Sequence, residues 1–148
     1  GENVTMQGPV QFNYGMHTKV GSNFFANYNF IVQDDGGVTI GDNFMAGPNV
    51  TLSTPLHPLS GRQRAGMVNE KGETFIPCYA KPITIGNDVW LCAGVVVCAG
   101  VTIGDGAVIG AGSVVTHDIP AGVLAYGVPC RVIREITEED EKAMEALI

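Results

Sequence analysis

The chain is poor in aromatic and charged residues and lacks the long apolar runs of membrane proteins and the basic clusters of nucleic-acid-binding proteins. Aromatic residues make up 7% and charged residues 16% of its 148 residues, and no apolar run approaches the roughly 20 residues that a membrane-spanning helix needs. Lysine and arginine total eight and form no stripe that could neutralise a nucleic-acid backbone, and the formal net charge is −7. No signal peptide is recognisable. We therefore expect neither nucleic acid nor a membrane among the partners.

The four cysteines also lack a functional pattern. Cys78, Cys92, Cys98 and Cys130 form no CxxC pair and no disulfide-dense spacing. Free, buried thiols are favoured over a metal site or disulfides. Such thiols suit a reducing compartment, so we expect a cytoplasmic protein. The chain begins at Gly1 rather than at a methionine, so an upstream segment could be missing.

What is abundant is a repeat of six residues. From Ile85 to Pro120 the sequence divides into IGNDVW, LCAGVV, VCAGVT, IGDGAV, IGAGSV and VTHDIP. The first position is always aliphatic, the second is small except at Thr116, and the fifth is small or aliphatic. A repeat of this kind predicts a stacked architecture in which each unit buries its face against its neighbours.

Six residues are too few for a strand followed by a helix, so each unit is expected to be one short strand and one corner. Glycine, asparagine and aspartate at the corners tolerate tight backbone geometry. Three units make one coil, and coils stack at the ~4.8 Å spacing of hydrogen-bonded strands. The fold class is therefore all-β, a parallel β-helix with aliphatic columns inside a triangular prism. Spacing alone leaves the hand of the coil open.

The N-terminal half repeats less regularly. Units begin at Val20, Ala26 and Val32. Two extra residues, Val38 and Thr39, then interrupt the period, and further units begin at Ile40, Ala46 and Leu52. The pattern then fails until Ile85, so residues from about 53 to 81 are expected to form a long excursion. Loops of this length are usually functional or disordered. We assign residues 1–136 to the β-helix and residues 137–148 to a short C-terminal helix.

The C-terminal segment is rich in acidic residues. Thr137 is a suitable N-cap, and acids follow it in the first turn. Ala143, Met144 and Leu147 would give the helix one apolar side. We expect the helix to cover the open last coil and so to blunt the exposed sheet edge. The acids that outnumber Lys142 here are Glu135, Glu138, Glu139, Asp140, Glu141 and Glu145.

Several segments together carry a more specific resemblance. They are FFANYNFIVQDDGGVTIGDN, PNVTLST followed by the proline-flanked His57, PITIGNDVW, VIGAGSVVT and GVPCRVIREI. In these segments the chain resembles the maltose and galactoside O-acetyltransferases, over residues 1–136. The resemblance implies a left-handed coil, acetyl-CoA as co-substrate without a required metal, and a homotrimer with sites between neighbouring prisms.

His57 is the first candidate for chemistry. A free imidazole titrates near pH 6.5 and can accept a proton from a hydroxyl as that hydroxyl attacks a thioester. From its position His57 could also be an ordinary loop histidine, but the resemblance implies the catalytic base. Asn27 could be a simple corner residue, and the resemblance implies that it contacts the acceptor and stabilises the transition state.

Further acceptor contacts follow from the resemblance. Asp35 is similar to the family's acceptor-binding aspartate, although its Asp-Asp-Gly-Gly surroundings also fit an Asx turn. Asn13 stands where relatives often carry serine and is assigned a sugar contact. His17 has no partner motif and is interpreted as structural or exposed.

Acetyl-CoA would bind along the corners of the prism. Small side chains leave backbone groups open to the pantetheine amides, and by resemblance these are Ala93, Ala111 and Thr116. Trp90, the single tryptophan, should point away from the core and line the acetyl site.

The phosphates of acetyl-CoA need cations. Arg131 and Arg134 can pair with phosphate oxygens, or they form a solvated pair that faces the acidic tail. His117 is assigned to the same site, where relatives commonly carry lysine.

The implied mechanism is direct transfer in a ternary complex, without an acyl-enzyme. A γ-type carbonic anhydrase would need three histidine ligands with two of them close together, and His17, His57 and His117 are far apart in the sequence. A xenobiotic O-acetyltransferase and a non-catalytic trimeric scaffold remain as alternatives. Relatives carry a helical segment before the first coil, and the excursion here is longer than in the galactoside enzymes, so the acceptor pocket can differ.

Overall fold

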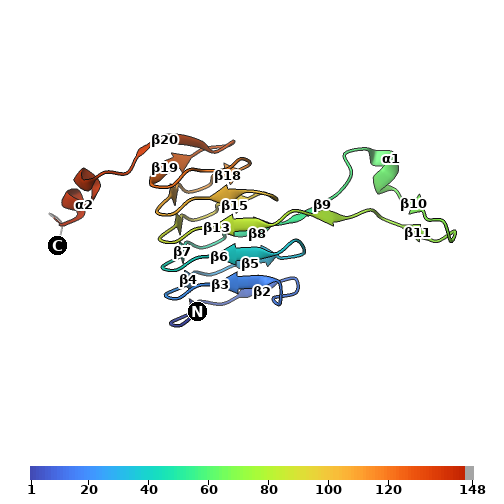
Figure 1. The fold of residues 1–148 in the computed structure, drawn as a ribbon, viewed down its shortest axis with the longest axis horizontal. Coiled ribbons are helices and arrows are strands. Elements are labelled where there is room, and N and C mark those ends of the chain that lie inside the picture. Colours follow the sequence, from blue (N-terminus) through green and yellow to red (C-terminus); the bar gives the residue numbers. More distant parts are fainter. Residues whose placement is uncertain (146–148) are drawn as a thin grey trace.

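Short parallel strands stack into a three-faced prism in the computed structural model, which describes residues 1–145 (Figure 1). The chain visits the first, second and third faces in turn, and each coil adds one strand to each face. Every pairing within the faces is parallel except that of the last two strands. The predicted parallel β-helix is confirmed.

The first face contains β1 (Thr5–Met6), β4 (Phe25–Ala26), β7 (Met45–Ala46), β14 (Trp90–Leu91), β17 (Val108–Ile109), β19 (Val123–Tyr126) and β20 (Arg131–Glu135). The second contains β2 (Val10–Phe12), β5 (Phe30–Gln33), β8 (Thr51–Ser53), β15 (Val96–Val97) and β18 (Val114–Val115). The third contains β3 (Thr18–Val20), β6 (Val38–Ile40), β13 (Ile83–Ile85) and β16 (Thr102–Ile103).

The aliphatic first positions of the hexapeptides form the core, as predicted. Each is at most 1% exposed, namely Ile85, Leu91, Val97, Ile103, Ile109 and Val115. In the N-terminal coils the fifth position is often aromatic, and the rings of Phe24 and Phe44 stack with their centroids 5.2 Å apart. Aromatic rings there and small residues in the later coils fill the same interior, so the prism stays packed along its length.

The small second positions have a steric cause. A Cβ atom added at Gly86 would lie 2.8 Å from the backbone nitrogen of Asp105 in the next coil.

The turn between the third and first faces also needs a positive φ, which Asn43 and Asp88 adopt in earlier coils and Gly106 in a later one. Asparagine tolerates this region and glycine enters it freely.

Insertions are confined to one corner of the prism. The turns from the second to the third face include residues 13–17, 34–37 and the excursion between β8 and β13. We call this the insertion corner. The turns from the first to the second face, residues 27–29, 47–49, 92–94 and 110–112, carry no insertion, and we call them the narrow corner.

The excursion is a structured arm that projects from the prism (Figure 1). Strand β9 (Pro55–Leu56) pairs antiparallel with β12 (Tyr79–Ala80) at its root. Helix α1 (Gly61–Arg64) and the antiparallel pair β10 (Met67–Val68) and β11 (Thr74–Phe75) form its outer part. The predicted excursion is therefore a ribbon rather than an open loop.

The two ends of the prism compare differently with the sequence expectation. The coil built from β1 and β2 lies within the residues 1–136 assigned to the β-helix, although the repeat is recognisable only from Val20. At the other end, β20 pairs with β19 and covers the sheet edge, while the described α2 residues Glu138–Glu145 project away from the prism (Figure 1). The expected covering role of the helix is wrong, because five acids outnumber its apolar residues and favour solvent. Leu147 and the side chain of Met144 lie outside the described residues.

Candidate functional site

The insertion corner gathers polar side chains that the sequence spreads over many coils. Asn13 directly follows β2, and Asp35 lies two residues after the end of β5, in the corresponding turn one coil later. The Asn13 Nδ2 atom donates a hydrogen bond to Asp35 Oδ2 at 2.8 Å. These two predicted acceptor contacts are thus brought together, and they present an amide and a carboxylate at one corner. Such a pair can hold sugar hydroxyls, which both donate and accept hydrogen bonds.

The root of the arm is tied to the turn that carries Asp35. Thr54 is fully buried, and its hydroxyl donates to the Gln33 carbonyl at 2.6 Å and accepts from the Gly36 backbone N–H at 2.9 Å. The arm therefore leaves the prism at a fixed point beside Asp35. Sequence reasoning missed Thr54, because nothing in its local pattern distinguishes a buried hydroxyl from a surface one.

A second buried group shapes the same corner. Asp34 accepts hydrogen bonds from the backbone N–H of Tyr14 at 2.8 Å and of His17 at 3.2 Å, and from the Thr18 hydroxyl at 3.1 Å. Burial raises the pKa of this carboxyl, but the hydrogen bonds outweigh burial and leave the pKa below its usual value. Asp34 thus stays an anion that organises residues 13–17. Sequence reasoning considered only Asp35 of the Asp-Asp-Gly-Gly segment, as an acceptor contact or an Asx turn, and assigned no role to Asp34.

His57 lies on the exposed arm directly after β9. Its Nδ1 atom is 2.9 Å from the carbonyl oxygen of Pro77, on the opposite side of the ribbon. Because a carbonyl can only accept, Nδ1 carries the proton and Nε2 keeps its lone pair. The antiparallel register pairs Leu56 with Tyr79, and this brings the Pro77 carbonyl next to the His57 ring. The arrangement leaves a ring nitrogen available as a proton acceptor.

The remaining predicted residues divide between the two corners. Thr116 and His117 lie at the insertion corner, and the Thr116 hydroxyl is 2.8 Å from His117 Nδ1. Asn27, Ala93 and Ala111 lie at the narrow corner, on the other edge of the second face. The two alanines are exposed, so the backbone beside them is accessible. One chain therefore does not bring Asn27 to His57.

Asn27 is half-buried and its side chain is oriented. The Oδ1 atom accepts a hydrogen bond from the Tyr28 backbone N–H at 2.8 Å. The carboxamide nitrogen donates to none of the described residues, so it can donate to a ligand. A fixed amide donor is a suitable group for an oxyanion.

Trp90 projects from the first face, as expected, and is 47% exposed. Its neighbours on adjacent strands are Met45 and Val108, and Phe25 and Leu124 continue the row. The corresponding outward row of the third face is polar, with Lys19, Thr39, Thr84 and Thr102. We call these rows the apolar row and the threonine row.

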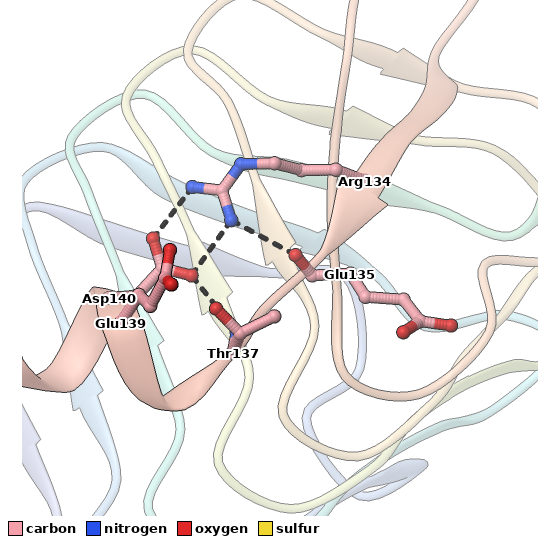
Figure 2. A pocket seen from close by; sticks show the side chains of 5 residues that line it. All are labelled: Arg134, Glu135, Thr137, Glu139 and Asp140. Carbon is pink, nitrogen blue, oxygen red and sulfur yellow. Dashed lines mark hydrogen bonds and ion pairs between the residues drawn. The ribbon is translucent and has the colours of Figure 1, made fainter.

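The two arginines lie in different surroundings. Arg131 and His117 line one hollow of about 330 Å³ near the last coils. Arg134 borders another of about 600 Å³, where its guanidinium forms a bidentate ion pair with Asp140 at 2.7 Å for both bonds (Figure 2). Asp140 also accepts from the Thr137 backbone N–H at 2.9 Å.

This ion pair changes the electrostatics of Arg134. The hydrogen bond and the charge of Arg134 lower the pKa of Asp140 to about 2, and the pKa of Arg134 is raised in turn. The alternative in which an arginine faces the acidic tail is therefore realised at Arg134. A phosphate at Arg134 must compete with Asp140, whereas the hydrogen bond that the Arg131 side chain makes is to the neutral Cys130 carbonyl.

The cysteines and histidines offer no other centre. Cys92 and Cys98 are half-buried and Cys130 is buried, and burial raises the pKa of each thiol. Cys78 is exposed on the arm, so the expectation of a buried thiol is wrong there. His17 is structural, with Nδ1 3.2 Å from the Asp34 carbonyl oxygen. Among residues 1–145, no cluster of three or more His, Cys, Asp or Glu side chains could hold a metal ion.

Comparisons with known proteins agree with this architecture. The model of the bacterial transferase hexapeptide (six repeats) matches residues 82–117. The galactoside O-acetyltransferase of Escherichia coli is 52% identical over 95% of this chain and 65% of its own length. A solved galactoside acetyltransferase in complex with coenzyme A superposes with a TM-score of 0.85 at 52% identity, covering 95% of this chain and 66% of that one.

A maltose O-acetyltransferase structure from Clostridium difficile matches with a TM-score of 0.81 at 43% identity, covering 90% of this chain and 67% of that one. The prism of stacked hexapeptide coils defines the fold class, a left-handed β-helix. Within that class the chain belongs to the maltose and galactoside O-acetyltransferase family of hexapeptide-repeat acyltransferases. It spans 65% of the length of the Escherichia coli relative. Among the described residues, no helix is both long and apolar enough to cross a bilayer.

Proposed function

We propose that the protein transfers an acetyl group from acetyl-CoA to a hydroxyl of a sugar or a similar small acceptor. The observation that carries the proposal is the orientation of His57, whose Nδ1–H is held by the Pro77 carbonyl at 2.9 Å. A base needs a free lone pair within reach of the acceptor hydroxyl, and Nε2 provides it on an exposed arm. The solved relative with bound coenzyme A supports the choice of co-substrate.

The reaction is a single displacement. His57 Nε2 accepts the hydroxyl proton while the acceptor oxygen bonds to the thioester carbon, and the carbonyl oxygen becomes an oxyanion. The Asn27 amide donates to that oxyanion. When the intermediate collapses, the carbon–sulfur bond breaks and the imidazolium returns its proton to the CoA thiolate. No cysteine nucleophile is needed, and the raised thiol pKa values of Cys92 and Cys98 keep both protonated at neutral pH.

Binding roles are assigned to the other predicted residues. Asn13 and Asp35 hold the acceptor, since their amide and carboxylate lie 2.8 Å apart at the insertion corner. Ala93, Ala111 and Thr116 leave backbone groups open to pantetheine, and Trp90 lines the acetyl site. Arg131 and His117 share the hollow that suits the phosphates. Arg134 joins them only if it leaves Asp140.

The separation of the two corners supports assembly of the site from more than one copy. We assign Asn27, Ala93 and Ala111 of one protomer and His57, Asn13 and Asp35 of its neighbour to each site, in a homotrimer. The apolar row gives the first face a surface that benefits from being covered. The free cysteines fit the cytoplasm, where acetyl-CoA is made and thiols stay reduced.

The proposal is tested by CoA thiol release from acetyl-CoA with maltose, glucose, galactosides and chloramphenicol-like acceptors. His57→Ala should lower kcat by about 10²- to 10⁴-fold, the contribution of a general base. Leu59→Ala is the matched control, because Leu59 is 95% exposed on the same arm. Activity with antibiotic acceptors alone would move the assignment to a xenobiotic acetyltransferase. If acetyl-CoA does not bind, the enzyme proposal fails and a trimeric scaffold replaces it.

A further inference from the structure

The segment that follows His57 is held by an arginine rather than by apolar packing. Leu59 is 95% exposed, and Ser60 and Gly61 are also exposed, so no core anchors this turn. The Arg64 Nη1 atom donates hydrogen bonds to the Pro58 carbonyl at 2.8 Å and to the Leu59 carbonyl at 2.7 Å. Both carbonyls lie within two residues of His57.

Each side of His57 therefore has its own constraint. On the preceding side, β9 is paired with β12, and the Pro77 carbonyl fixes Nδ1. On the following side, the backbone hydrogen bonds of α1 begin only at Ser60, whose carbonyl accepts from the Arg64 N–H. Between these two elements, the Arg64 guanidinium makes the only side-chain hydrogen bonds to residues 58 and 59 among the described residues. A single nitrogen of a permanently charged group, Nη1, thus donates to two consecutive carbonyls.

We propose that Arg64 is a positioning residue for His57. It holds the turn after the base so that the imidazole stays within reach of Pro77, with Nδ1 protonated and Nε2 directed to the acceptor. The inference rests on the proposed function, in which His57 is the base. Arg64 itself touches neither substrate, and it acts through the backbone of residues 58 and 59.

The chain provides a matched control. Arg62 lies in the same four-residue helix α1, is exposed and has no hydrogen bond to the 58–59 segment. Arg64→Gln removes the charge and shortens the side chain, while Arg64→Lys keeps the charge but replaces the planar guanidinium with an ammonium that places its donors differently. Arg62→Gln removes an equal charge from the arm and should leave activity unchanged.

The kinetic test measures kcat and KM for acetyl-CoA in these variants. Arg64→Gln should lower kcat roughly 10- to 100-fold, because a displacement of about 1 Å at a catalytic group costs this much, with little change in KM. Arg64→Lys should fall between Arg64→Gln and the wild type, and added guanidinium should restore part of the Arg64→Gln loss. Equal losses in Arg62→Gln, or wild-type kcat in Arg64→Gln, would overturn the proposal.

A second readout does not depend on turnover. The protein has three histidines, and ¹⁵N labelling of their rings, assigned with His57→Ala, reports which nitrogen of His57 carries the proton. The wild type should show the Nδ1–H tautomer, and Arg64→Gln should show a mixture with Nε2–H. An unchanged tautomer in Arg64→Gln would refute the positioning role. If the tautomer shifts while the wild type transfers no acetyl group, the proposed function fails and the Arg64 inference stands.

Discussion

The insertion corner and the narrow corner of the prism differ in how they tolerate sequence. The narrow corner repeats short turns closed by residues with positive φ, namely Asn29, Asn49, Gly94 and Gly112. The insertion corner admits extra residues in three coils and stabilises them with buried polar groups, Asp34 and Thr54. A β-helix can insert residues at one corner because the faces on either side keep their register. The scaffold thus keeps two corners regular and takes its insertions, with the buried polar groups that hold them, at the third.

A parallel difference separates the faces. The apolar row of the first face offers burial to a second copy, whereas the polar side chains of the threonine row suit contact with solvent. Together the two contrasts give the proposed site its geometry, in which one copy supplies the insertion corner and the next supplies the narrow corner.

The largest effect should come from charging the apolar row. Met45 is 50% exposed in the single chain, and Met45→Lys would bury an unpaired ammonium in the proposed interface. We expect sedimentation to show monomers, and activity to fall roughly tenfold or more because the site is then incomplete. Thr84→Lys in the threonine row is the control and should leave mass and activity unchanged. A trimeric, active Met45→Lys protein would move the interface to another face.

The next effect concerns the buried anion of the insertion corner. Asp34→Ala leaves the Tyr14 and His17 backbone N–H groups without their partner. The expected loss is about 1–3 kcal/mol of the free energy of unfolding for each donor left buried and unsatisfied. Urea denaturation measures it. A loss below about 0.5 kcal/mol would mean that water replaces the carboxylate and that this corner is not held from within.

The same carboxylate makes stability depend on pH. The folded pKa of Asp34 lies below its usual value, so the folded state binds fewer protons than the unfolded state in acid. Its contribution is present above about pH 4 and is lost as the pH falls through the folded pKa. Asp34→Asn should flatten the fall in stability below about pH 4, and an unchanged pH profile would contradict the assignment.

A smaller effect is expected at the narrow corner. Gly112 has φ +69°, and an added Cβ would meet no atom within 4 Å. Gly112→Ala therefore tests backbone strain without a clash, and should cost about 1–2 kcal/mol in thermal or urea unfolding. Gly112→Asn, at the same position, should cost less than Gly112→Ala, because asparagine tolerates this backbone region better. Equal costs for both would contradict the interpretation that φ decides the residue choice.

The smallest effect concerns Arg134. Asp140→Asn removes the negative charge that holds the Arg134 guanidinium. A substitution is needed because Asp140, with a pKa of about 2, stays ionised at every pH at which the enzyme would be assayed. If Arg134 then reaches a phosphate, KM for acetyl-CoA should fall about two- to threefold, the scale of an exposed ion pair. Arg131→Gln, in contrast, should raise KM in both backgrounds. An unchanged KM in Asp140→Asn would leave phosphate binding to Arg131 and His117 alone.

The repeat predicted the prism because buried columns impose a period on the sequence. Leu91 and Ile109 are neighbours in space and occupy equivalent positions 18 residues apart, so periodicity alone reveals the contact. The repeat is not recognisable in the first coil, although its residues were assigned to the β-helix, because Phe12 and Val20 are separated by an insertion and are only half-buried. The outward direction of Trp90 followed from the same period. The roles of Asp34 and Thr54 did not, because buried polar partners are set by tertiary contacts rather than by spacing.

The sequence proposes which residues form the candidate site but does not predict how they are arranged. A resemblance assigns His57 and Asn27 to one site without saying that they lie on different corners of one chain. It also cannot reveal that Asp140 competes for Arg134 or that Arg64 holds the turn after His57, since these contacts depend on local side-chain geometry.

The most direct test of the account mixes two inactive variants. His57→Ala and Asn27→Ala are each expected to lose most activity, and the two are refolded together in equal amounts. If each site takes His57 from one copy and Asn27 from the next, about one quarter of the sites regain both residues, and activity returns to about one quarter of the wild-type value. Activity no higher than that of the separate variants would contradict the account, because His57 and Asn27 would then act within a single chain.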